Sequence, residues 1–144
     1  MRSLKKLLQL SAGELAVLVQ AAALLPAVRL ALNFVTVARL QALGGLRAAT
    51  PGNAELTAQT MAHLVRIAGD HGLCHAKCLE QSLVLRWLLQ RKGIDARMFF
   101  GARKEDSEMQ AHAWVEVDGV AVNEGDDLHE RFSPFEKIAA PNTQ

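Results

Sequence analysis

The stretch CLEQSLVLRWLLQRKGIDARMFFGARK, residues 78–104, contains the change of pattern that decides the fold. From Cys78 to Lys92 apolar side chains recur every three or four residues, which predicts an amphipathic helix, and Gly93 ends it. The run 96–104 is short, apolar and interrupted by one glycine, which predicts a strand. Cys78 is therefore expected at the start of a helix that leads into a sheet.

A hairpin is expected after this strand. HAWVEVDG, residues 112–119, alternates strictly between two faces, as strands do, and its final Asp-Gly pair is a strong turn signal. VAVNE, residues 120–124, is the expected return strand. KEDSEMQ, residues 104–110, predicts a polar loop, and DDLHERFSPF, residues 126–135, an irregular or briefly helical tail.

The first half of the chain predicts helices. One begins at Ser11, where SAGE has the Ser-x-x-Glu form of a capping box, and runs to about residue 25. Pro26 either kinks it or starts a second helical stretch that reaches about residue 43. A third helix is expected over 53–68. Its apolar residues are expected near one face: Leu56, Met61, Leu64, Val65 and Ala68.

These elements predict an α+β fold, with helices first and then the Cys78 helix packed on a small antiparallel sheet. The length of 144 residues suits one domain over 1–144, with a helical region of about 1–70 and a catalytic core of about 71–135. Half of the residues are apolar and 22% are charged, which excludes a disordered chain. A net charge of +1 with no strong basic block argues against a nucleic-acid partner.

The apolar run LAVLVQAAALLPAV, residues 15–28, follows basic residues and superficially resembles a signal peptide. Glu14 separates it from those residues, and 14 residues are too few to span a bilayer, which takes about 20. We expect a helix of the fold, with peripheral membrane contact as a lesser alternative. Only two cysteines are present, which favours a reducing, cytoplasmic location over a secreted disulfide scaffold.

The segment HGLCHAKC, residues 71–78, has three interpretations. His71, Cys74, His75 and Cys78 could bind zinc, but structural zinc sites usually draw their ligands from two separated segments. A Cys74–Cys78 disulfide would be transient in a reducing cytosol. The third interpretation makes Cys78 a nucleophile, because free N–H groups and the dipole at a helix start lower the pKa of a thiol.

A nucleophilic thiol needs a histidine within reach and a group that orients that histidine. His112 lies on the second predicted strand, and the two-residue turn brings Glu124 close to it across the hairpin. Asp118 and Asp126 are alternatives for the acidic group, although Asp118 suits the turn better. Spacing alone does not separate this site from a buried structural cysteine.

CLEQSLVLRWLLQRKGIDARMFFGARK, followed by AHAWVEVDG and VNE, resembles the transglutaminase-like cysteine proteases of lasso-peptide biosynthesis, in particular the stand-alone leader peptidase. The resemblance covers about residues 73–135, including FSPF near the end. It implies a transglutaminase-like or papain-like fold without a metal or cofactor. It also implies Cys78 as nucleophile, His112 as general base and acid, and Glu124 as the orienting group, where relatives often have Asp.

The reaction implied by the resemblance is hydrolysis of one peptide bond in a ribosomally made precursor, which releases the leader from the core peptide. The implied partners are this precursor, a small leader-binding recognition protein and an asparagine-synthetase-like cyclase that closes the freed core. The small size of the catalytic part suggests that the leader-binding partner docks on an apolar face within residues 11–43. Acyl transfer to an amine and a non-catalytic helical adaptor are the alternative functions.

Overall fold

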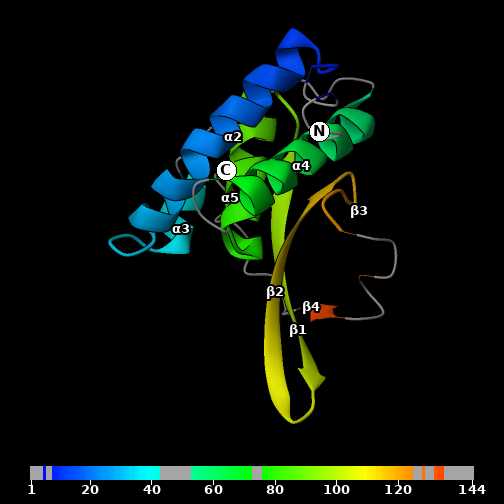
Figure 1. Cartoon of the computed structure of the whole chain (residues 1–144). Coiled ribbons are helices and arrows are strands. Elements are labelled where there is room, and N and C mark those ends of the chain that lie inside the picture. The colour runs from blue at the N-terminus through cyan, green and yellow to red at the C-terminus, as the bar shows by residue number, and fades with distance from the viewer. Residues whose placement is uncertain are drawn as a thin grey trace.

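The computed structural model describes residues 5, 8–42, 53–72, 76–124, 128 and 132–134, without the side chains of 103–105, 133 and 134. Within these residues four longer helices precede a four-stranded antiparallel sheet of order β3-β2-β1-β4 (Figure 1). The helices are α2 (Ala12–Ala31), α3 (Val37–Ala42), α4 (Ala54–His71) and α5 (Cys78–Arg91), and the strands are β1 (Ala96–Glu105), β2 (Glu108–Val117), β3 (Val120–Ala121) and β4 (Ser133–Pro134). The α+β prediction is confirmed.

Helix α2 begins with the predicted capping box. The Ser11 hydroxyl accepts a hydrogen bond from the Glu14 N–H at 3.2 Å, and the Glu14 carboxylate accepts one from the Ser11 N–H at 2.8 Å. The predicted helix end near residue 25 is wrong, because α2 continues through Pro26 to Ala31; of the two roles expected for Pro26, the start of a separate second helix is excluded. Leu25 is buried immediately before the proline, so packing holds the helix in place there. The break lies instead at 32–36.

Helix α4 packs with the predicted face inward at Met61, Leu64, Val65 and Ala68. The prediction for Leu56 is wrong, because its side chain is 66% exposed. Five residues are about 1.4 helical turns, so Leu56 points away from the side on which Met61 is buried.

Helix α5 has the predicted bounds within one residue and ends at Arg91. Gly93 follows the C-cap residue Lys92, and its φ of 79° is the left-handed conformation that glycine adopts readily. Strands β1 and β2 then pair over their full length, from Ala96 with Val117 to Glu105 with Glu108. The polar loop predicted over 104–110 is therefore wrong. Asp106 and Ser107 both adopt positive φ, so these two residues make the whole turn.

The return strand is shorter than predicted. Val120 and Ala121 pair with β2 through the expected Asp-Gly turn, but β3 ends there. The prediction of an irregular or helical tail is also wrong in part, since Ser133 and Pro134 form β4 beside Gly101 and Ala102 of β1. Both differences have one cause. Side chains of Ser82 and Asn123 occupy the edge of β2 beyond β3, and β4 occupies the edge of β1.

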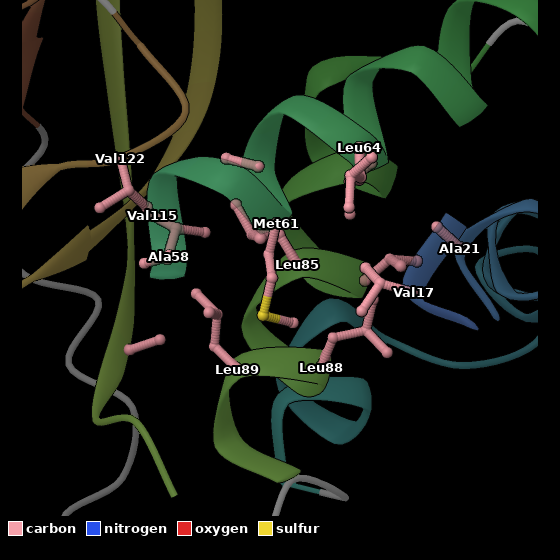
Figure 2. Close-up of a cluster of buried hydrophobic side chains, with 14 of the residues drawn as sticks. Val17, Ala21, Ala58, Met61, Leu64, Leu85, Leu88, Leu89, Val115 and Val122 are labelled. Carbon is pink, nitrogen blue, oxygen red and sulfur yellow. The ribbon is translucent and has the colours of Figure 1, made fainter. Parts of the chain in front are cut away.

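One buried cluster joins the helical half to the sheet. Val17 of α2, Met61 of α4, Leu85 of α5, Val115 of β2 and Val122 meet within it (Figure 2). The helices cover one end of the β1–β2 hairpin, while the exposed turn at the other end extends beyond them (Figure 1). A shared core is what the predicted single domain over 1–144 requires.

The opposite face of the sheet has its own small core. Trp114 is fully buried there with Leu128 and Phe132, and Phe99 packs against them. The C-terminal segment therefore covers this face at 128 and 132, while α5 covers the other.

Helix α2 is long and apolar enough to cross a membrane by length and composition alone, and only 17% of its most apolar window is buried. At 20 residues it is longer than the 14-residue run from which the sequence argued against a span, so that argument does not hold. One such helix is weak support for a membrane segment, because core helices pass the same test.

Candidate active site

Cys78 occupies the first position of α5, and its thiol is free. The preceding Lys77 is extended, and its N–H donates to the Glu80 carboxylate at 2.8 Å, which fixes the start of the helix. Lys77 has no side-chain acceptor with which to cap the N–H groups that follow it. The Leu79 N–H of this first turn is one of the groups that lower the pKa of the Cys78 thiol.

His112 and Glu124 are in contact, as the sequence predicts. The His112 Nε2 atom lies 2.6 Å from Glu124 Oε1, and both side chains are about four-fifths buried. This contact uses Nε2, so Nδ1 is the ring nitrogen left to exchange a proton with the thiol. The carboxylate fixes the tautomer and orientation of the ring.

Cys78 and His112 are hydrogen-bonded through their side chains, and each changes the pKa of the other. The bond to His112 is the largest influence on Cys78 and lowers the pKa of the thiol, with smaller help from the N–H groups of Ala113 and Leu79. The same bond, with that to Glu124, raises the pKa of His112 from 6.5 to about 9. Both shifts favour a thiolate–imidazolium pair over a neutral thiol and imidazole.

Two aromatic rings hold the imidazole from the side. Phe132 stacks on His112 with ring centroids 4.8 Å apart, and Trp114 lies at 6.3 Å. Both planes are inclined by 24° to the imidazole. The ring is thus restrained by the C-terminal segment as well as by its own strand.

A cleft of about 440 Å³ opens at the thiol. Cys78 and Glu124 line one part of it, and α4 forms another wall with Gln59, His63 and Arg66. Arg66 Nη2 lies 3.2 Å from His63 Nδ1 on that wall. A substrate carbonyl in this cleft would have direct access to the sulfur.

Asp118, the first alternative for the acidic group, does not join these three side chains. Asp118 lies exposed in the β2–β3 turn with a φ of 51°, which fits the turn role expected for it. Asp126, Cys74 and His75 lie outside the described residues, so the zinc and disulfide interpretations of 71–78 stay predictions. Among the described residues, no group of three or more metal-binding side chains lies together.

Sequence reasoning missed the residues that support the three central ones. Ser82, Asn123 and Phe132 contact the strand or ring that carries the site. Phe132 belongs to the FSPF stretch of the family resemblance, and Asn123 directly precedes Glu124. These two positions were the signals available in the sequence, but neither a phenylalanine nor an asparagine indicates a role in the site by its residue type alone.

Comparison with known proteins gives two findings. Residues 21–137 match the sequence profile of the Transglutaminase-like superfamily. The microcin J25-processing protein McjB of Escherichia coli is 31% identical over 61 residues, which is 42% of this chain and 28% of McjB. This chain thus matches less than a third of that relative's length. No solved structure matches with comparable significance. Because the profile covers most of the chain, the protein belongs to the Transglutaminase-like superfamily.

Proposed function

We propose that this protein is a cysteine peptidase that removes the leader from a ribosomally made lasso-peptide precursor. The main support is the contact of Cys78, His112 and Glu124 beside an open cleft. The similarity to a microcin-processing protein supports a peptide precursor as the substrate. We place the reaction in the cytoplasm, where a free thiol persists.

The proposed reaction begins with attack of the Cys78 thiolate on the scissile carbonyl. N–H groups in the first turn of α5 stabilise the oxyanion, and one such donor contributes about 3 kcal/mol in other enzymes. Protonated His112 gives its proton to the leaving amine, which becomes the free N-terminus of the core peptide. A thioester to Cys78 remains on the leader. His112 then takes a proton from water, which hydrolyses the thioester and releases the leader.

The freed α-amine of the core peptide is the group that an asparagine-synthetase-like cyclase would join to an acidic side chain. We propose that a leader-binding protein presents the precursor to this peptidase. The outward side of α2 supports this partner, because Leu15, Val19 and Leu30 are exposed there. Contact of the same side with a membrane is the alternative.

The first experiment combines the protein, the leader-binding partner and the precursor, and measures product masses. We expect free leader and free core, with cleavage lost in Cys78→Ala and His112→Ala. Cys74→Ala and the exposed-site variant His71→Ala are matched controls that should retain it. An amine adduct of the leader in place of the free acid would indicate acyl transfer. Normal maturation with folded Cys78→Ala would indicate an adaptor instead.

The partner proposal has a separate experiment. Val19→Asp and Leu30→Asp should lower partner-dependent cleavage while alkylation of Cys78 stays at the wild-type rate. The exposed Leu56→Asp on α4 serves as the control for adding a charge to an apolar surface position. Unchanged cleavage in both α2 variants would reject this docking face.

A further inference from the structure

A hydrogen-bond network joins α5 to the hairpin next to the candidate active site. The Ser82 hydroxyl donates to the Ala113 carbonyl at 3.1 Å and accepts from Asn123 Nδ2 at 3.2 Å. Asn123 Oδ1 in turn accepts from the Val115 N–H at 2.9 Å. Ser82 is fully buried, so its bond to the Ala113 carbonyl is shielded from competition with water, while the two bonds of Asn123 are partly buried.

The Asn123 side chain replaces a missing part of the β2–β3 ladder. The pairs Val117–Val120 and Glu116–Ala121 predict that Val115 pairs next with Val122. The Val122 N–H does donate to the Val115 carbonyl at 3.0 Å, but the Val115 N–H goes to Asn123 Oδ1 instead of a backbone carbonyl. The return strand therefore leaves the sheet at this point.

Beyond Val115, helix α5 occupies the edge of β2 at Ala113. The Ala113 carbonyl accepts a hydrogen bond from Ser82, and the Ala113 N–H lies close enough to Cys78 to lower the pKa of its thiol. Cys78 and Ser82 are four residues apart, so they lie on the same side of the helix. A strand that continued regularly would bring Glu124 to pair with Ala113, so its early end leaves this edge open to the thiol.

We propose that Asn123, with Ser82, is a positioning residue that sets the geometry of the three candidate catalytic side chains. Each contact of the network lies close in sequence to one of them: Ser82 is one turn beyond Cys78, Ala113 follows His112, and Asn123 precedes Glu124. The polar atoms of the Asn123 amide are engaged with Ser82 and Val115, so the residue acts through the backbone it holds. The kinetic part of this proposal depends on the proposed function, but its thiol-reactivity part does not.

The first test measures the rate of alkylation of Cys78 by iodoacetamide as a function of pH, in the Cys74→Ala background so that one thiol is followed. Asn123→Ala should move the profile to higher pH, because a displaced edge weakens the contacts that favour the thiolate. Leu88→Ala is the control, since it lowers stability from the core side of the same helix without touching the network. Its profile should stay at the parent position.

The second test uses precursor cleavage. Asn123→Ala should lower kcat roughly 10- to 100-fold, as expected for misplaced reacting groups, with KM changed by less than about twofold. Ser82→Ala should have a smaller effect, because Asn123 still holds Val115. The double variant should be no worse than Asn123→Ala alone, since both act through one shared network.

A folded Asn123→Ala protein with an unchanged alkylation profile would overturn the proposal. So would a rise in KM at constant kcat, which would assign Asn123 to substrate binding. If Asn123→Ala does not fold, the same two measurements are made on Ser82→Ala. A wild-type alkylation profile together with a wild-type kcat in Ser82→Ala would then reject the positioning role of the network. If no precursor is cleaved by the wild-type protein, the proposed function fails while the alkylation result still decides this inference.

Discussion

The Cys78 thiol and the His112 ring shift each other's pKa in opposite directions. The hydrogen bond between them lowers the pKa of the thiol, and it raises the pKa of the imidazole from 6.5 to about 9. Protonated His112 therefore favours the folded state. That contribution is complete below pH 6.5 and is lost as the pH rises through about 9. His112 should accordingly stay protonated across neutral pH.

Replacing His112 should make Cys78 an ordinary thiol. In His112→Ala the largest influence that lowers the thiol pKa is absent, so alkylation by iodoacetamide should require a higher pH, approaching the usual value of about 8.5. The measurement is the alkylation rate against pH in the Cys74→Ala background. His63→Ala, on the α4 wall of the cleft, should leave the profile unchanged. A His112→Ala profile equal to that of the parent would contradict the assigned contact.

Replacing Glu124 by Gln should lower the pKa of His112. Both the hydrogen bond and the charge of Glu124 raise this pKa, and Gln removes the charge. The imidazolium should then lose its proton below pH 9, which NMR titration of the His112 ring can follow. Asp118→Asn is the matched control, because Asp118 lies exposed in the turn. A larger decrease of the His112 pKa in Asp118→Asn than in Glu124→Gln would identify Asp118 as the acidic group instead.

At the scale of elements, sequence patterns predicted several features that depend on local rules. The α5 start at Cys78 and the Asp-Gly turn follow from periodicity and turn chemistry, and both lie where expected. The early end of β3 and the pairing of β4 depend on which distant segment packs against the edge of each strand. Asn123 shows the difficulty, because an asparagine side chain that completes a ladder has no signature in a single sequence.

The β2–β3 turn offers a test of the hairpin that carries the site. Gly119 has a φ of 81°, and a Cβ added there would have no heavy atom within 4 Å, so Gly119→Ala meets backbone strain and no clash. We expect a loss of about 1–2 kcal/mol in the free energy of unfolding, the usual cost of left-handed backbone for a residue with a Cβ. Urea unfolding measures it.

Asp118→Asn is the partner variant for that experiment. Its φ of 51° suits asparagine as well as aspartate, so the free energy of unfolding should stay within about 0.5 kcal/mol of the wild type. A loss as large as that of Gly119→Ala would show that the Asp118 carboxylate has a structural role beyond the turn.

At the scale of the whole molecule, the fold class was predictable but the contacts that unite it were not. Helical and strand periods in successive parts of the chain identify α+β, whereas Leu25 and Val117 enter the same core cluster only through tertiary packing. The candidate site shows the same division. Cys78, His112 and Glu124 could be predicted as candidates from residue type, spacing and resemblance. The contact of the Phe132 ring that restrains His112 could not.

The shared core predicts that the helical half and the sheet unfold together. Leu25 is 1% exposed, and Leu25→Ala should lower the free energy of unfolding by about 2–5 kcal/mol, as for other buried leucines. Circular dichroism follows the helices, while tryptophan fluorescence follows Trp114 on the sheet and Trp87 on α5. A single domain requires both signals to shift to the same lower urea midpoint. A fluorescence transition that stays in place while the helical signal is lost would divide the chain into two units, because α2 would then unfold independently of the core that carries the site.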